Sequence, residues 1–361
     1  GSGGEGIKDE IYYFKDKSDR ELGLRYDLTV PLGRIAATNQ LQKPFKRYVI
    51  DRVYRYDRPQ AKRYREFTQA DVDVIGVKSV LADFECLQIA IDVMRGLDFE
   101  FKIRVNNRKV LEELALKMEI KEDQIKGAFR SIDKLDKLGM KEVEKEFKQK
   151  EINTRILGQI EGNSFDDTQN YLKDSEAIKE LNELLDLCKE NNFSEIEFDL
   201  SLARGLEYYT GNVFEITIEG GPSVAAGGRY DKLIGLYGGQ DTPATGISFG
   251  IDRLFDYLED TLIIGPNTDV FIIGLSKEAV SEAFKLSAKL RKQRLGVEVD
   301  LTGRNLKKNL DYANKKGIGF VIVLGENELK EKKFKLKDMN SGKEQEIGFD
   351  DINEISNFVK K

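Results

Sequence analysis

The apolar runs of this chain have the length of β-strands, which limits what it can fold into. Residues 270–273 and 320–324 are examples, and both are far shorter than the roughly 18 apolar residues of a membrane-spanning helix. We find no positively charged start followed by an apolar stretch, and so expect no signal peptide. The two cysteines, Cys86 and Cys188, provide neither a disulfide framework nor a zinc-binding spacing. The sequence therefore predicts a cytoplasmic protein without a membrane partner.

The order of strand-like and helix-like segments indicates more than one domain, as does the length of 361 residues at roughly 150 residues per domain. Residues 5–117 and 173–265 are rich in strand patterns. Residues 118–172 are rich in Lys and Glu with apolar residues at helical spacing, which predicts a helical insertion. Residues 267–361 alternate strands with helices, a pattern typical of a sheet covered by helices. The fold class that we predict is α+β with a C-terminal α/β domain.

Local signals place several helices. Residues 27–40 read as a helix in which Pro31 is tolerated in the first turn. Ser79 is the predicted N-cap of a helix over residues 80–97, and Ser276 the predicted N-cap of a helix that follows a strand.

The sequence contains no histidine. Without imidazole there is no Ser-His-Asp or Cys-His nucleophile and no His-ligated metal. Any chemistry must come from carboxylates, arginines, lysines, tyrosines or a metal carried in with the substrate. Acyl transfer through a covalent serine intermediate is therefore excluded.

Basic residues gather in residues 43–65, which hold nine Lys and Arg but two Asp in a chain of net charge −6. Six of the nine are arginines, whose planar guanidinium suits phosphate recognition. A strand–turn–strand would place Arg55 and Arg65 on one face, where they could clamp a polyphosphate. The alternative is a solvated basic hairpin.

Two glycine-containing segments also carry polar groups. Residues 202–211 combine an arginine beside a glycine with two tyrosines, which could bind a polar ligand or form a β-turn with core tyrosines. In residues 225–253, glycines on strands permit the close approach of a flat ligand, and Arg253 could stack on a purine.

Together these segments resemble the motifs of histidyl-tRNA synthetases, which are class II aminoacyl-tRNA synthetases. Residues 24–32 resemble the first amino-acid-binding segment of the family in its archaeal and eukaryotic form. Residues 54–69 resemble class II motif 2, residues 204–211 resemble a signature specific to histidine enzymes, and residues 246–253 resemble motif 3. The resemblance implies a class II catalytic domain with an antiparallel sheet core over residues 5–117 and 173–265, and an anticodon-binding domain over residues 267–361.

The resemblance implies a histidine–tRNA ligase that uses ATP and Mg²⁺. Histidine attacks the α-phosphate of ATP, and the acyl group then passes to tRNA(His). Arranged arginines and Mg²⁺ can stabilise the charge on the five-coordinate phosphate without a covalent nucleophile. By resemblance the catalytic residues are Arg55 and Arg204, no metal is held by the protein itself, and ATP is bound by Arg55, Asp57, Arg63, Phe67 and Arg253.

The amino-acid pocket is also assigned by resemblance. A carboxylate suits it because it accepts an imidazole N–H and favours a protonated amino group. The implied histidine-binding residues are Asp27, Thr29, Arg55, Gln69, Asp73, Arg204, Tyr208, Tyr209 and Tyr230.

The same resemblance implies a homodimer and contacts to tRNA. The helical insertion resembles the one that touches the acceptor stem. The C-terminal domain offers four lysines as phosphate contacts, with a solvated helix face as the alternative: Lys307, Lys308, Lys315 and Lys316.

Two features depart from the family pattern. Lys62 stands where most members carry a glycine before the loop arginine, and no segment before residue 11 resembles motif 1, which builds the dimer interface. We therefore expect a chain that keeps the pocket but dimerises poorly and adenylates slowly. The alternative functions are a weak or inactive synthetase-like fragment, and a regulatory paralogue that binds histidine or tRNA.

Overall fold

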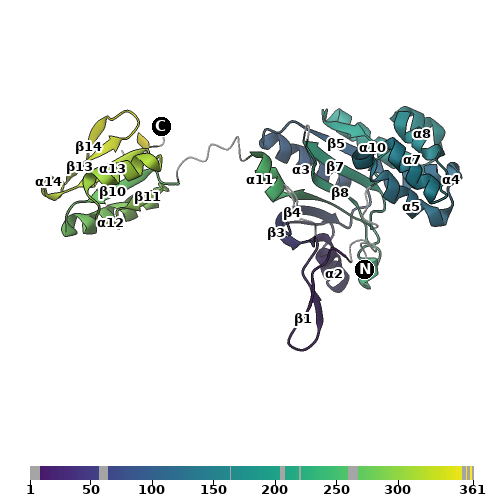
Figure 1. Cartoon of the computed structure of the whole chain (residues 1–361), viewed down its shortest axis with the longest axis horizontal. Coiled ribbons are helices and arrows are strands. Elements are labelled where there is room, and N and C mark those ends of the chain that lie inside the picture. The colour runs from purple at the N-terminus through teal and green to yellow at the C-terminus, as the bar shows by residue number, and fades with distance from the viewer. Residues whose placement is uncertain are drawn as a thin grey trace. The chain divides into compact units, whose positions relative to one another are not determined.

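The computed structural model describes residues 9–56, 64–162, 164–203, 208–218, 221–258, 267–351, 355 and 358–359. The chain separates into two compact units, residues 1–261 and 262–361. Figure 1 shows the elements of each unit.

A seven-stranded sheet forms the centre of the first unit, with the strand order β3-β4-β9-β8-β7-β5-β6. Neighbouring strands are antiparallel except for β5 and β6, which are parallel. The strands are β3 (Phe45–Tyr54), β4 (Glu66–Ile75), β5 (Phe101–Asn107), β6 (Ile196–Phe198), β7 (Asn212–Ile218), β8 (Ser223–Arg229) and β9 (Ala244–Gly250).

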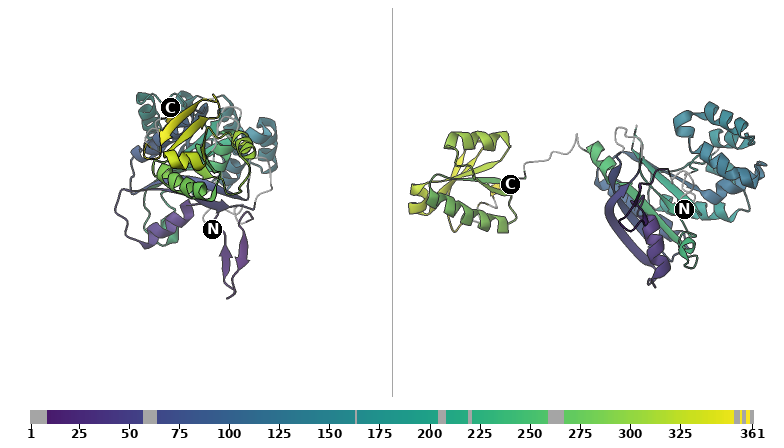
Figure 2. Two further views of the ribbon diagram at one scale, coloured as in Figure 1. Left: turned by 90° about the vertical axis from the view of Figure 1, so that its left-hand side faces the viewer. Right: turned by 60° about the horizontal axis from the view of Figure 1, so that its bottom comes forward.

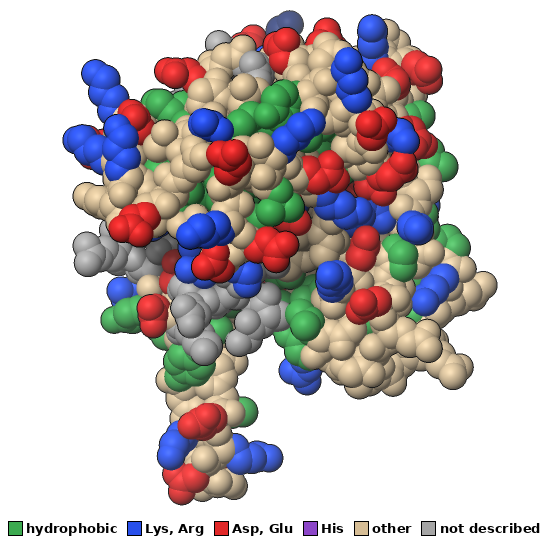
Figure 3. Space-filling view, turned by 90° about the vertical axis from the view of Figure 1, so that its right-hand side faces the viewer, with side chains coloured by type: hydrophobic (Ala, Val, Ile, Leu, Met, Phe, Trp, Pro, Cys, Tyr) green, Lys and Arg blue, Asp and Glu red, His purple; other side chains and the backbone are tan. Residues whose placement is uncertain are grey.

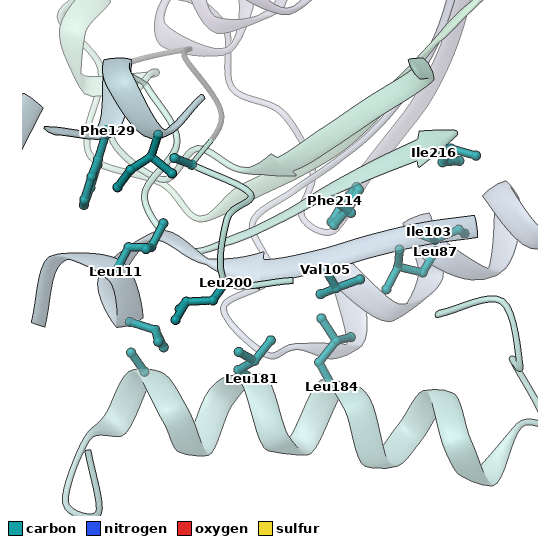
Figure 4. Close-up of a cluster of buried hydrophobic side chains, with 14 of the residues drawn as sticks. Leu87, Ile103, Val105, Leu111, Phe129, Leu181, Leu184, Leu200, Phe214 and Ile216 are labelled. Atoms are coloured by element: carbon teal, nitrogen blue, oxygen red, sulfur yellow. The ribbon is translucent and has the colours of Figure 1, made fainter. Parts of the chain in front are cut away.

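The two faces of this sheet differ because side chains alternate along each strand. On one face, Ile103, Val105, Phe214 and Ile216 enter a large buried apolar cluster. Helices α3 (Leu81–Gly96) and α10 (Glu176–Glu190) contribute to the same cluster, and Figure 4 shows Leu181 and Leu184 of α10 pointing toward Val105. The other face is mostly polar, so it is the face available for chemistry.

A group of helices follows β5 and lies beside the sheet next to α10 (Figure 2). Their apolar sides join the same core, for example through Phe129, Val143 and Phe147, which are buried. The helices are α4 (Arg108–Lys117), α5 (Glu122–Ile132), α6 (Leu135–Leu138), α7 (Met140–Gln149), α8 (Arg155–Gly162) and α9 (Phe165–Tyr171).

Shorter elements complete the first unit. β1 (Tyr13–Lys15) and β2 (Glu21–Gly23) form an antiparallel hairpin, which projects from the body and carries acidic and basic side chains at its tip (Figure 3). The rest are α2 (Thr29–Thr38), the 3₁₀ helix η1 (Gly235–Tyr237) and α11 (Ile251–Leu258).

The second unit is a five-stranded sheet of order β11-β10-β12-β13-β14. β10 pairs in parallel with β11 and β12, and the remaining pairs are antiparallel. α12 packs on one face and α13 on the other, since Val270 and Ile272 share a core with α12 and Phe271 and Ile273 share one with Ala313. The elements are β10 (Val270–Gly274), α12 (Lys277–Lys292), β11 (Val297–Val299), α13 (Leu306–Lys315), β12 (Phe320–Leu324), α14 (Glu326–Glu331), β13 (Lys333–Asp338) and β14 (Glu344–Gly348).

The predicted α+β class is confirmed, and so is the predicted cap of α12, where the Ser276 hydroxyl accepts a hydrogen bond from the Ala279 N–H. The prediction for α3 was wrong by one residue. That helix begins at Leu81 with Val80 at the N-cap position, although the Ser79 hydroxyl still accepts from the Leu81 N–H at 3.2 Å. Among the described residues, no helix has both the length and the apolar character needed to cross a membrane.

Candidate active site

The polar face of the seven-stranded sheet forms the floor of a cavity of about 1360 Å³. Four alternate residues of β4 line it: Phe67, Gln69, Asp71 and Asp73. Their neighbours Ala70, Val72 and Val74 pack into the apolar core on the opposite face. The two-residue period of one strand therefore builds both the core and the cavity floor.

Asp73 is a buried carboxylate of this floor, with 2% of its surface exposed. Nε of Arg47 lies 3.0 Å from its Oδ2, and the Tyr230 hydroxyl donates a hydrogen bond to its Oδ1. Burial raises the pKa of Asp73, and the Arg47 charge and the Tyr230 hydrogen bond oppose that shift. Gly246 makes room for the Asp73 carboxylate, since a β-carbon at position 246 would lie 2.3 Å from Oδ1 of Asp73.

Asp27 provides a second carboxylate just before α2. Its Oδ1 accepts a hydrogen bond from the Val30 N–H at 2.9 Å. Burial raises the pKa of Asp27, and the hydrogen bond from Val30 and the charge of Arg55 lower it. Thr29, the first residue of α2, lines the cavity beside it.

Asp71 is a third buried carboxylate, between Gln69 and Asp73 on β4. Burial raises its pKa to about 7, against a hydrogen bond from Ser248 that lowers it. Ser248 is its cross-strand partner on β9 and donates its hydroxyl hydrogen to Oδ1 of Asp71. The Ser248 oxygen in turn accepts from Nε2 of Gln69 at 2.8 Å.

Two arginines, Arg55 and Arg253, line the same cavity. The guanidinium carbon of Arg55 lies 4.3 Å from the ring centre of Tyr26 and 5.1 Å from that of Phe67. Arg253 belongs to α11, which follows β9 directly, and its Nη1 donates to the backbone oxygen of Ser223. The cavity thus combines cationic groups suited to an anion with carboxylates suited to a cation.

Three tyrosines form a further wall. The Tyr208 and Tyr209 ring centres are 4.9 Å apart, and the Tyr208 and Tyr230 ring centres are 6.2 Å apart. All three side chains are buried. Burial raises the pKa values of the Tyr208 and Tyr230 phenols, so both keep their hydroxyl hydrogens near neutral pH.

The cavity extends along the sheet to Arg104 of β5. Three carboxylates surround this guanidinium. The distances from its nitrogens to the carboxylate oxygens are 2.6 Å for Glu215, 3.0 Å for Asp199 and 2.7 Å for Asp136. Because Asp136 belongs to α6, this cluster joins the helical group to the sheet.

A family model described as histidyl-tRNA synthetase matches residues 1–254. The chain belongs to the histidyl-tRNA synthetase family. A second model, described as an anticodon binding domain, matches residues 269–359. Both findings confirm the resemblance that the sequence motifs indicated.

Individual members of this family are similar over most of their length. A histidine–tRNA ligase of Shouchella clausii is 40% identical and covers 96% of this chain and 86% of its own. A histidine–tRNA ligase of Methanocaldococcus jannaschii is 37% identical, and the match covers 98% of this chain and 86% of the relative. The solved histidyl-tRNA synthetase from Nostoc sp. PCC 7120 superposes with a TM-score of 0.81 at 30% identity, covering 97% of this chain and 86% of that one.

The structure brings together most of the residues that the synthetase motifs single out. Asp57, Arg63 and Arg204 lie outside the described residues. The others all line the one cavity: Asp27, Thr29, Arg55, Phe67, Gln69, Asp73, Tyr208, Tyr209, Tyr230 and Arg253.

Arg65 does not join this group. The Arg55 N–H donates to the Arg65 carbonyl at 2.9 Å, so the two residues do oppose each other. However, the Arg65 guanidinium lies over the Tyr56 ring, at 4.9 Å, and Arg65 is not one of the described residues that line the cavity. The structure therefore does not place the two guanidinium groups together in this cavity, as the predicted clamp requires.

Sequence reasoning missed Asp71, Ser248 and Arg47. Asp71 had a visible signal, because it stands at the same two-residue period as Gln69 and Asp73. The roles of Ser248 and Arg47 depend on strand register, which places them opposite Asp71 and Asp73.

Proposed function

We propose that this chain is a histidine–tRNA ligase, which activates histidine with ATP and transfers it to tRNA(His). One observation carries the proposal for the chemistry: a single cavity holds Arg55 and Arg253 together with Asp27, Asp73 and a tyrosine wall. An amino acid and a nucleotide need such opposite charges close together, because one carries an ammonium group and the other phosphates.

In the first step the histidine carboxylate attacks the α-phosphate in line, and pyrophosphate leaves. Arg55 would contact the carboxylate and the α-phosphate, since its guanidinium is held between Tyr26 and Phe67. We assign Arg204 to the same phosphate. These fixed charges would stabilise the five-coordinate phosphate without reorganising during the reaction. ATP would enter as its Mg²⁺ complex, and the Mg²⁺ would neutralise part of the phosphate charge.

The nucleotide would extend from this phosphate toward α11. Phe67 and Arg253 both line the cavity and would stack on the two faces of adenine. Asp57 and Arg63 are further proposed ATP contacts, with Arg63 directed to the outer phosphates.

The amino acid would occupy the acidic pocket. Asp27, Thr29 and Gln69 are the proposed partners of its ammonium group, and Asp73 with the three tyrosines those of its imidazole. Because Asp73 is buried and already ordered by Arg47 and Tyr230, a side chain without a matching N–H would leave it incompletely paired. Sites of this kind reject analogues strongly.

We also propose how tRNA is held. Residues 118–172 would contact the acceptor stem, and residues 267–361 would bind the anticodon. Lys307, Lys308, Lys315 and Lys316 lie in or next to α13 and are candidate phosphate contacts.

A second copy of the chain is the proposed partner of β3. This strand lies at an edge of the sheet, where Tyr48 is 80% exposed and Ile50 is 62% exposed. Exposed apolar side chains on a sheet edge favour protein contact.

The two cysteines are free and buried, which agrees with the proposed cytoplasmic location.

ATP–pyrophosphate exchange with each amino acid in turn tests the proposal, followed by aminoacylation of tRNA(His). We expect exchange with histidine alone and charging of tRNA(His). Histidine or tRNA binding without exchange would instead identify a regulatory or tRNA-sensing relative, and exchange with another amino acid would contradict the proposed specificity.

A further inference from the structure

Asp71 and Ser248 form a hydrogen-bonded chain with Gln69 on the cavity floor, and of these three residues the reaction described above uses only Gln69. The three side chains come from two adjacent strands, β4 and β9, in which Asp71 and Ser248 are direct cross-strand partners. Ser248 donates to Asp71, and Nε2 of Gln69 donates to Ser248 at 2.8 Å. Asp71 is 2% exposed and Gln69 is 9% exposed, so water does not readily replace these bonds.

The other end of the Gln69 amide has no partner. Its Oε1 atom is buried and accepts no hydrogen bond from the residues that the structure describes. A buried amide oxygen left unpaired is costly, and Gln69 lines the cavity. An N–H donor of a bound ligand would satisfy this oxygen.

The chemistry of the three groups fixes which end of the amide is left open. An ionised carboxylate can only accept hydrogen bonds, and a hydroxyl has a single hydrogen to donate. When Ser248 gives its hydrogen to Asp71, its oxygen can only accept, so it must face the amide nitrogen of Gln69. A protonated Asp71 can donate to Ser248, which frees the serine hydrogen for Oε1 and permits the reversed amide.

We propose that Asp71 is a positioning residue that acts through Ser248 to hold the Gln69 amide oxygen toward the cavity, where it accepts a hydrogen bond from the ammonium group of the amino acid. This inference rests on the proposed function, because it takes the cavity as the histidine site. It makes the ionised form of Asp71 the competent form for histidine binding.

Several charged and titratable groups surround Asp71 and act on its ionisation. They are Asp73 on the same strand, Arg47 on β3, Asp27 before α2, and Tyr208. Asp27 and Asp73 disfavour the ionised form and Arg47 favours it. The pKa of Asp71, about 7, makes the proposed arrangement sensitive to pH near neutrality.

The test measures KM for histidine and KM for ATP in pyrophosphate exchange, in the wild type, Asp71→Asn, Ser248→Ala and Ser248→Thr. At pH above 7 we expect KM for histidine to rise about ten-fold in Asp71→Asn and Ser248→Ala, as for loss of a hydrogen bond to a charged group. Ser248→Thr keeps the hydroxyl, so its KM for histidine should be close to that of the wild type. KM for ATP should stay within about two-fold of the wild type in all three variants. The matched control is Ser341→Ala in the second unit, which removes a serine hydroxyl that donates to a different carboxylate, Asp338, at 2.7 Å.

The pH profile separates positioning from a general structural effect. The ratio of the Asp71→Asn KM for histidine to that of the wild type should be near one in acid and rise as pH passes through about 7. Ionisation of histidine itself cancels in this ratio. In a Gln69→Ala background, Asp71→Asn should have no further effect, because its action passes through Gln69.

Three outcomes would overturn the inference: an unchanged KM for histidine in both variants, a ratio independent of pH, or an undiminished effect in the Gln69→Ala background. Circular dichroism melting identifies any variant that fails to fold. If Ser248→Ala does not fold, the KM for histidine of the isosteric Asp71→Asn variant alone tests the inference. Absence of exchange in the wild type would overturn the proposed function instead. Calorimetric titration with histidine would then still measure the effect of the same variants.

Discussion

Arg47 and Asp73 are cross-strand partners on β3 and β4, and their side chains form an ion pair of 3.0 Å at the base of the cavity. The carboxylate is almost wholly buried, whereas 18% of the arginine side chain is exposed. Arg47 also donates from Nη2 to the Leu28 carbonyl at 2.8 Å, next to Asp27. One guanidinium therefore fixes both the acidic pocket and the segment that enters α2.

Arg47→Met should destabilise the protein by about 3–5 kcal/mol, because it leaves a buried carboxylate without its counter-charge. Urea unfolding followed by circular dichroism measures this. Arg52→Met is the matched control on the same strand, since Arg52 pairs with Glu66 while 66% exposed. It should cost less than about 1 kcal/mol. Equal losses in the two variants would show that the buried pair has no special role.

Gly246→Ala should weaken histidine binding by about ten-fold or more, because its β-carbon would collide with Oδ1 of Asp73 at 2.3 Å and displace a hydrogen-bonded carboxylate. KM for histidine in pyrophosphate exchange reports the effect. Gly250→Ala is the control for stability on the same strand, because its nearest contact would be an ordinary 3.5 Å. A Gly246→Ala variant with unchanged KM and melting temperature would contradict the packing described.

Asp71 should make stability depend on pH. Its pKa is raised from 3.8 to about 7 in the folded protein, so folding favours the protonated form. The contribution is fully present below about pH 4 and is lost as pH rises through about 7, with a slope of at most about 1.4 kcal/mol per pH unit. Asp71→Asn should lack this loss. Urea unfolding of both proteins across this range checks it, and parallel stability curves would rule it out.

The sequence motifs located most of the cavity because class II segments carry their functional residues at fixed spacings. Phe67, Gln69 and Asp73 were found in this way, whereas Asp71 was missed although it stands at the same two-residue period. Local capping rules likewise found the start of α12 at Ser276.

Features that depend on register and packing could not be predicted in the same way. The Arg65 carbonyl accepts a hydrogen bond from the Arg55 N–H, yet the Arg65 guanidinium lies over the Tyr56 ring. Ser248 meets Asp71 only because β9 pairs antiparallel with β4 in one register. Asp71 and Ser248 are 177 positions apart, and no local pattern in the sequence specifies their pairing.

Histidine-dependent pyrophosphate exchange in Arg55→Ala tests most directly whether the guanidinium and the acidic pocket belong to one active site. Arg304→Ala is the control, since Arg304 lies over Tyr312 in the second unit, at 5.1 Å. We expect kcat/KM to fall by about a hundred-fold or more in Arg55→Ala, as for loss of a transition-state charge partner, and to stay within about two-fold in Arg304→Ala. Exchange at the wild-type rate by folded Arg55→Ala would contradict the assignment.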